Sequence, residues 1–230
     1  MNTVHVVIAV HGVKSYSGGM GISERKERQR AELRERILKA AREMVVREGF
    51  GALSMRKLAE AIEYAPATLY LHFENRDEIA RELSVRGFQQ LLEYLAPAAR
   101  VEEPMERLTA AARAYVRFGL EQPETYRLIF MEDPKLTTAL FGEGKEDAGA
   151  KAFAFLVQPL EELKAAGRLA ADADTRQLAE VFWAGVHGIV SLKLTCPGFQ
   201  GTEADVLAST LVTTFFHGLP GMKEAQRPSG

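Results

Sequence analysis

One short segment, residues 54–73, constrains the fold more than any other part of the chain. Its first half repeats apolar side chains at i, i+3, i+4 and i+7, the spacing of one helix face; these are Met55, Leu58, Ala59 and Ile62. Ser54 stands just before this face, where a serine oxygen caps free backbone amides. Pro66 marks a second start, because proline favours the first position of a helix. The segment therefore predicts two short helices joined by a turn.

The second of these helices is expected to run from Pro66 to about His72. Its spacing turns Leu69 and Phe73 inward and leaves Ala67, Thr68 and Tyr70 outward. Small side chains let a backbone approach a groove wall, and hydroxyl groups can bond phosphate oxygens or base edges. Two short helices joined by a turn are the arrangement that fits a helix into the major groove, so the segment favours DNA binding.

Further helices flank this pair. Upstream, an apolar stripe predicts a supporting helix that ends at Gly49, a residue suited to the left-handed turn that closes helices; the stripe is Leu33, Ile37, Ala41, Met44 and Val45. Downstream, Asn75 and Glu78 have the spacing of a capping box, which predicts another helix through Leu83 towards Leu95. The result is a three-helix reader with a connecting fourth helix.

These segments resemble the DNA-binding domain of the tetracycline-repressor (TetR) family of bacterial transcriptional regulators. The resemblance covers residues 30–83 and is carried by ILKAA, GFGALSMRKLAEAIEYAPATLYLHF and NRDEIA in that order. It implies that the second helix of the pair enters the major groove and that Phe73 is a core residue. The DNA-binding residues that it implies are Ser54, Arg56, Ala65, Pro66, Ala67, Thr68, Tyr70, His72 and Arg76.

Three positions depart from the family's common pattern. Glu63 stands where a glycine is frequent in the turn, and Ala65 stands where a serine cap is frequent. Glu74 stands where many relatives place a lysine against a phosphate, so its carboxylate would repel DNA unless Arg76 supplies the contact. A different interpretation remains open, because any small helical bundle shows similar spacing. Tyr70 and His72, each taken singly, could equally cover the edge of a core.

The charge of the chain is compatible with local rather than global attraction to DNA. A formal net charge of -2 and a pI near 6.3 exclude a protein that holds DNA by an overwhelming positive field. Positive charge gathers between residues 24 and 36, where six basic residues outnumber four acidic ones. This stretch predicts an arm that touches the phosphate backbone, or alternatively a solvated helix face with i,i+4 ion pairs.

The remaining body, residues 84–221, is also expected to be helical. Turn-forming residues separate five helical segments after the connecting helix; the breaks fall at Pro104, 122–123, 133–149, 167–174 and 196–201. Residues 122–128 and 183–188 resemble the regulatory domain of a TetR subgroup named for a Trp-His-Gly motif. The spacing puts Trp183 and His187 one turn apart, and Gly185 and Gly188 would allow a neighbouring helix to approach closely.

The resemblance further implies that the last two long helices, 178–194 and 203–219, form a homodimer interface. The helices before them would enclose a pocket for a small apolar or amphipathic effector. Aromatic side chains are the candidates to line it, although each is first of all a core residue; they are Tyr115, Phe118, Tyr126, Phe130, Phe155, Trp183 and His187. His187 could instead be a core or interface histidine whose hydrogen bonds are satisfied.

Nothing in the sequence predicts catalysis, a metal or a cofactor. The histidines lack metal-ligand spacing, and Cys196 is the single cysteine. Residues 1–19 resemble neither a signal peptide nor a membrane span. We expect residues 1–22 to be a disordered or non-native extension, with Met20 as the true start, and residues 222–230 to be a flexible tail. These features together predict a cytoplasmic protein that does not bind membranes.

The predicted function is that of a DNA-binding transcriptional regulator. Residues 23–83 would read DNA, and residues 84–221 would bind the effector and form the dimer. A homodimer would recognise a palindromic double-stranded operator, and the effector would release it, as expected of a repressor; activation stays open. Two alternatives remain: a DNA-binding helical protein without an effector, and an all-helical enzyme.

Overall fold

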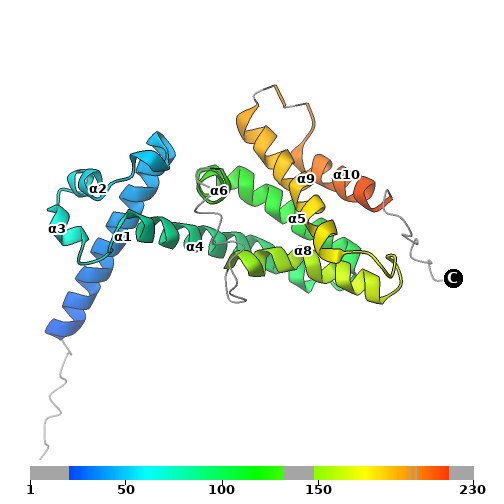
Figure 1. The fold of residues 1–230 in the computed structure, drawn as a ribbon, viewed down its shortest axis with the longest axis horizontal. Helices are drawn as coiled ribbons and strands as arrows, with labels where there is room; N and C mark the ends of the chain where they lie inside the picture. Colours follow the sequence, from blue (N-terminus) through cyan, green and yellow to red (C-terminus); the bar gives the residue numbers. More distant parts are fainter. Residues whose placement is uncertain (1–20, 132–147, 197, 200, 218–230) are drawn as a thin grey trace, which may run out of the picture.

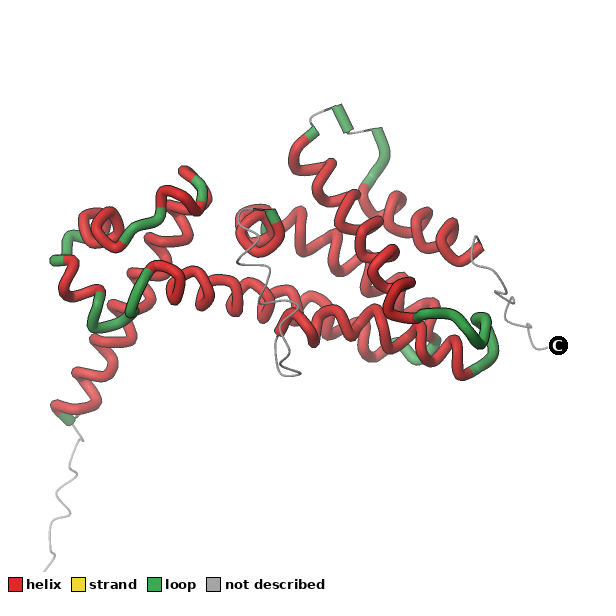
Figure 2. Tube along the Cα trace, in the orientation of Figure 1, coloured by secondary structure: helices red, strands yellow, loops and turns green. Residues whose placement is uncertain are grey.

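The structure is a computed structural model that describes residues 21–131, 148–196, 198–199 and 201–217. Within these ranges the regular elements are all helices, as the sequence predicts (Figures 1 and 2). They are α1 (Ile22–Glu48), η1 (Phe50–Ala52), α2 (Met55–Ala61), α3 (Pro66–Leu69), α4 (Arg76–Leu95), η2 (Ala96–Arg100), α5 (Pro104–Glu121), α6 (Pro123–Phe130), α8 (Ala148–Ala165), α9 (Thr175–Thr195) and α10 (Ala204–His217).

The predicted capping residues begin the short helices. The Ser54 hydroxyl accepts a hydrogen bond from the Lys57 amide at 3.2 Å, and Pro66 opens α3. The Asn75 side chain accepts one from the Glu78 amide at 2.9 Å. The return bond of the predicted capping box differs, because the Glu78 carboxylate accepts the amide of Glu74, at 2.6 Å, rather than that of Asn75. Local capping therefore sets where α2, α3 and α4 start.

The charged stretch before the supporting helix is itself helical, so an arm leading into that helix was the wrong expectation. It is the first half of α1, a single helix of 27 residues, and Arg28 and Glu32 form an i,i+4 pair at 3.5 Å. Gly49 ends α1 with φ 78°, the positive value that was predicted, but its ψ of 164° is extended rather than left-handed helical. Only glycine adopts that combination readily.

The turn between α2 and α3 forces an unusual backbone on Glu63. Its φ is 60°, the one positive value among the non-glycine residues that the structure describes. The Tyr64 amide donates to the Ala59 carbonyl and the Glu63 amide to the Glu60 carbonyl, at 2.9 and 3.3 Å. These bonds define a Schellman motif, in which glycine usually holds the position of Glu63. The departure noted in the sequence is thus a site of backbone strain.

The second helix of the pair is shorter than predicted, since α3 ends at Leu69 rather than His72. Beyond it the chain tightens: the Leu71 amide donates to the Thr68 carbonyl and the His72 amide to the Leu69 carbonyl, each three residues back. Such bonds are typical of a 3₁₀-like last turn. We call residues 66–73, which comprise α3 and this turn, the reading segment.

Helix α4 connects the N-terminal helices to the C-terminal bundle (Figure 1). It packs against α1 at its start and against α5, α6 and α8 further along. A Cβ added at Gly87 would lie 2.5 Å from Ile129 of α6, so α4 and α6 are in close contact there. Gly185 similarly faces Leu211 of α10, as predicted, whereas a Cβ at Gly188 would meet no described atom within 4 Å. Close approach of a neighbouring helix at Gly188 therefore stays a prediction.

Candidate nucleic-acid interface and interior cavity

The reading segment presents one face to solvent and buries the other. Leu69 and Phe73 are buried, which confirms their predicted inward direction. Three small residues at the start, Ala65, Pro66 and Ala67, are exposed, and Thr68 and His72 are half-buried. Tyr70 is 55% exposed and Leu71 is 70% exposed. Leu71 was not among the predicted DNA-binding residues. Its position next to the outward-facing Tyr70 was the signal in the sequence that could have identified it as exposed.

The flanking candidates are held in different ways. Arg56 is exposed on α2 and pairs with Glu60 at 3.1 Å. Arg76 folds back onto its own domain, where it donates to the Leu53 carbonyl at 3.4 Å and lies 5.3 Å from the centre of the Phe50 ring. Arg76 therefore stabilises the domain in this conformation and is not extended beside Glu74.

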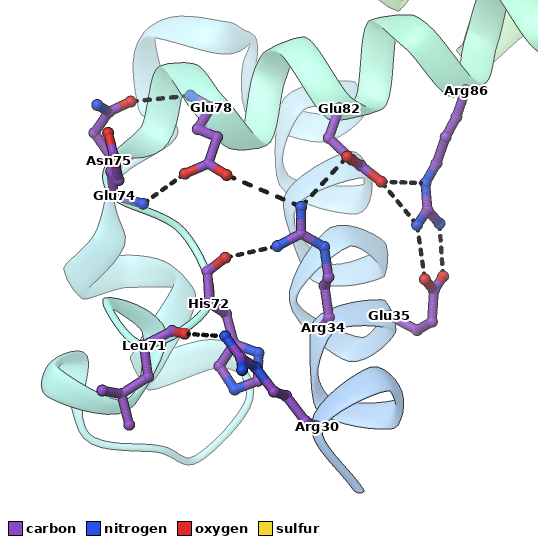
Figure 3. A network of polar contacts seen from close by, with 10 residues as sticks. All are labelled: Arg30, Arg34, Glu35, Leu71, His72, Glu74, Asn75, Glu78, Glu82 and Arg86. Atoms are coloured by element: carbon purple, nitrogen blue, oxygen red, sulfur yellow. Dashed lines mark hydrogen bonds and ion pairs between the residues drawn. The ribbon is translucent and has the colours of Figure 1, made fainter. Parts of the chain in front are cut away.

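Two arginines of α1 hold the end of the reading segment (Figure 3). Arg30 donates to the Leu71 carbonyl at 3.3 Å, and Arg34 donates to the His72 carbonyl at 2.6 Å. Burial, together with these two positive charges, lowers the pKa of His72. The imidazole is therefore neutral near pH 7, so in the free protein its side chain adds no positive charge to this face.

The C-terminal bundle encloses an apolar cavity of about 40 Å³. Among the described residues, its wall is built from α4, α5, α6, α8 and α9, and none of the side chains that these contribute is charged. The lining residues are Phe88, Leu91, Leu95, Ala111, Ala112, Tyr115, Phe130, Gly149, Ala152, Phe153, Leu156, Trp183 and Val186. A volume of this size holds no more than a few water molecules, whereas small-molecule sites typically measure about 300–1,000 Å³.

A buried polar cluster lies beside the cavity. The Tyr115 hydroxyl accepts a hydrogen bond from the Trp183 indole at 3.1 Å and lies 3.2 Å from the Tyr126 hydroxyl. Tyr126 lies 2.6 Å from Nδ1 of His187, and Ser191 lies 3.2 Å from Nε2 of the same ring. Burial lowers the pKa of His187 and raises the pKa of both tyrosines. The cluster is therefore neutral, and His187 has partners for both ring nitrogens.

The structure separates the predicted pocket residues into three groups. Tyr115, Phe130 and Trp183 line the cavity. Tyr126 and His187 belong to the adjoining polar cluster, and Phe118 is fully buried and packs edge-to-face against Tyr94. Phe155 is absent from the lining, where Phe153 of the same helix stands instead. The sequence also gave no signal for the wall that α4 supplies through Phe88.

Other classes of site find no support in the described residues. No group of three or more potential metal ligands occurs among the residues that the structure places. None of the placed helices combines the length and apolar character needed to cross a membrane.

Comparison with known families gives the context for this geometry. Residues 37–83 match the model described as bacterial regulatory proteins, tetR family. Residues 108–216 match the model described as tetracyclin repressor-like, C-terminal domain, and together the two models cover most of the chain. The chain belongs to the TetR family. Because this is a family of DNA-binding transcriptional regulators, membership agrees with the expectation of a non-enzymatic protein.

Individual relatives of this TetR family member are distant. The uncharacterised regulator YobS of Bacillus subtilis is 29% identical over 96 residues, which are 42% of this chain and 50% of YobS. The chain thus spans about half the length of that relative. A solved protein of unknown function from Rhodococcus sp. RHA1 is 25% identical over 90% of this chain and 99% of its own, with a TM-score of 0.63. A transcriptional regulator from Saccharomonospora viridis, solved with choline, is 20% identical over 82% and 98%, with a TM-score of 0.61.

Proposed function

We propose that this TetR protein is a homodimeric regulator that binds a near-palindromic operator and is released by a small effector. The observation that carries the proposal is the solvent-facing side of the reading segment, which follows a well-capped α2 and has its hydroxyl and small side chains outward. The proposed DNA contacts are those of Ser54, Arg56, Ala65, Pro66, Ala67, Thr68, Tyr70, His72 and Arg76, with Arg76 swinging out from Leu53.

The proposed dimer interface is formed by α9 and α10. Val181 on α9 and Val206 on α10 are 56% and 53% exposed, and Leu192 is also exposed. Gly188 lies between the two apolar residues of α9 and leaves open space above its backbone. A second copy would cover these side chains and set two reading segments about one DNA turn, or a small multiple of it, apart. Leu192→Arg should then convert dimer to monomer in sedimentation experiments, and an unchanged dimer would place the interface elsewhere.

The proposed effector site is the apolar cavity. Its aromatic lining suits a small apolar or amphipathic molecule, and the S. viridis regulator with choline supports small-molecule binding in this fold. The cavity must widen to admit such a molecule, since it holds only about 40 Å³. One wall belongs to α4, which also leads to the N-terminal helices, and in this proposal the cavity widens by displacing that helix. An effector that prefers the widened form then shifts the population away from DNA.

The polar cluster supports assignment to the subgroup with the Trp-His-Gly motif. Trp183 and His187 lie one turn apart and meet through Tyr115, which lies 3.1 Å from the indole nitrogen and 3.2 Å from Nδ1. In this proposal the motif holds the wall of the cavity in place. Repression relieved by effector, in the cytoplasm, is the expected mode of action.

The deciding experiment is an anisotropy titration against DNA that flanks the protein's own gene, at several fixed salt concentrations. We expect saturable binding that resists competitor DNA. Tyr70→Phe removes only a hydroxyl and should weaken operator binding. Tyr70→Ala also removes the ring and should weaken binding further. No specific binding to these fragments or to a genome-wide library would refute the proposal. A ligand library that never raises the melting temperature would favour the alternative without an effector.

A further inference from the structure

We infer that Arg34 is a positioning residue that fixes the reading segment to α4, so that operator affinity depends on this guanidinium although it need not touch DNA. The inference rests on the proposed function, because it concerns how the proposed DNA-reading surface is held. It assigns a role to a residue of the supporting helix that the sequence analysis did not single out.

The Arg34 side chain joins three elements (Figure 3). From α1, one nitrogen donates to the His72 carbonyl at 2.6 Å, at the end of the reading segment. The other lies 3.3 Å from a Glu82 carboxylate oxygen and 4.0 Å from a Glu78 oxygen, both on α4. The guanidinium carbon lies 4.0 Å from the centre of the Phe73 ring. A planar fork with several donors suits such a junction, and a lysine could not reproduce it.

The reading segment needs an external support of this kind. Helix α3 has only four residues, whereas isolated helices shorter than about 12–15 residues are marginal in water. The chain after it is held by single turns, and two of its carbonyls, those of Leu71 and His72, accept hydrogen bonds from Arg30 and Arg34. Its position is therefore set by the side chains beneath it rather than by its own helical bonds.

The α4 side of the junction is fastened in turn. Glu82 also accepts a hydrogen bond from Arg86 at 3.0 Å, and Arg86 pairs with Glu35 of α1 through two contacts of 2.6 and 2.7 Å. The hydrogen bond from Arg86 holds the pKa of Glu35 below its usual range. Exposed ion pairs contribute little individually, but this set shares residues and spans α1 and α4. A displacement of α4 thus reaches His72 through Glu82 and Arg34.

Two measurements test the inference on the full chain. Operator affinity across a salt series is compared for the wild type, Arg34→Gln and Lys39→Gln, a control that removes one positive charge from an exposed i,i+4 pair on the same helix, α1. We expect Arg34→Gln to weaken binding roughly tenfold at every salt concentration, as for the loss of a charge-assisted hydrogen bond, with an unchanged salt slope. A phosphate-binding arginine would instead lower the slope by about one, and that result would overturn the inference.

The second measurement uses hydrogen exchange in the free protein, so it is independent of DNA. Arg34→Gln should speed exchange of the amides at 70–73 and leave those of α2 unchanged, and Arg34→Lys should restore part of the protection. Unchanged exchange at 70–73 would show that the segment is held without Arg34. If the wild type shows no specific operator binding, the proposed function is refuted. The role of Arg34 in holding the reading segment is still decided by the exchange result.

A double substitution tests the connection to α4. Glu82→Gln should weaken operator binding less than Arg34→Gln, and it should add little in the Arg34→Gln background, because its effect passes through the same guanidinium. Fully additive losses would show that α4 is not connected to the reading segment through Arg34.

Discussion

Replacing Glu63 by glycine should stabilise the protein. The residue adopts φ 60° at the position of a Schellman motif where glycine is usual. An L-residue in this left-handed region costs about 1–2 kcal/mol. Glycine relieves that cost but adds about 0.5–1 kcal/mol of conformational entropy to the unfolded chain. The expected net gain is therefore about 0–1.5 kcal/mol, and for a chain of this size each kcal/mol raises the melting temperature by about 2–4 °C.

Thermal unfolding followed by circular dichroism, at fixed protein and salt concentrations, measures this gain. Two matched variants separate backbone strain from charge. Glu63→Ala removes the carboxylate but keeps the Cβ, so its melting temperature should stay close to that of the wild type. Glu63→Asn should fall between alanine and glycine, because asparagine tolerates the left-handed region better than most residues. A gain by alanine equal to that by glycine would refute the strain argument and point to relief of charge repulsion instead.

Further predictions follow from the packing, the titrating groups and the exposed side chains. Gly87→Ala should destabilise by about 1–3 kcal/mol in urea unfolding, because its methyl would lie 2.5 Å from an α6 side chain; Gly51→Ala, where an added Cβ meets nothing within 4 Å, is the control, and equal effects would contradict this. Stability should fall between about pH 7.5 and 5.5, because the lowered pKa values of His72 and His187 mean that the unfolded chain takes up protons first. His187→Gln should flatten that slope, and an unchanged slope would exclude His187 as its source. Leu71→Ser should alter base preference in a binding-site selection, since an exposed apolar side chain suits a thymine methyl; an identical selected site would contradict a direct contact.

Local chemistry made the starts of α2, α3 and α4 predictable from the sequence. Ser54, Pro66 and Asn75 act through neighbours within a few residues, and such interactions can be read from spacing alone. The end of the reading segment could not be predicted in this way. The arginines that bind the Leu71 and His72 carbonyls lie 41 and 38 residues earlier in the chain, and their contact exists only after the helices have packed.

The residues that line the cavity were also only partly predictable, because they depend on tertiary packing and not on local sequence. Phe153 and Phe155 are the same residue type in an apolar stretch of sequence. Two positions along a helix turn a side chain by about 200°, so the two rings face different surroundings. Which one meets α9 depends on how α8 is rotated, and periodicity does not reveal that when most of the segment is apolar. The wall supplied by Phe88 was missed for the same reason, because α4 packs against α1 at its start and against α5, α6 and α8 further along.

The length of α4 has a mechanical consequence. Phe88 borders the cavity, and Arg76 begins the helix beside the reading segment. These residues are twelve positions apart, or about 18 Å along a helix that rises 1.5 Å per residue. If α4 pivots as a stiff rod near Phe88, a tilt of only 5° moves its far end by about 1.5 Å over that length. This displacement is about half the length of a hydrogen bond, so a slight rotation of α4 where it borders the cavity is enough to disturb contacts between the reading segment and DNA. A small molecule bound in the cavity could therefore control operator binding.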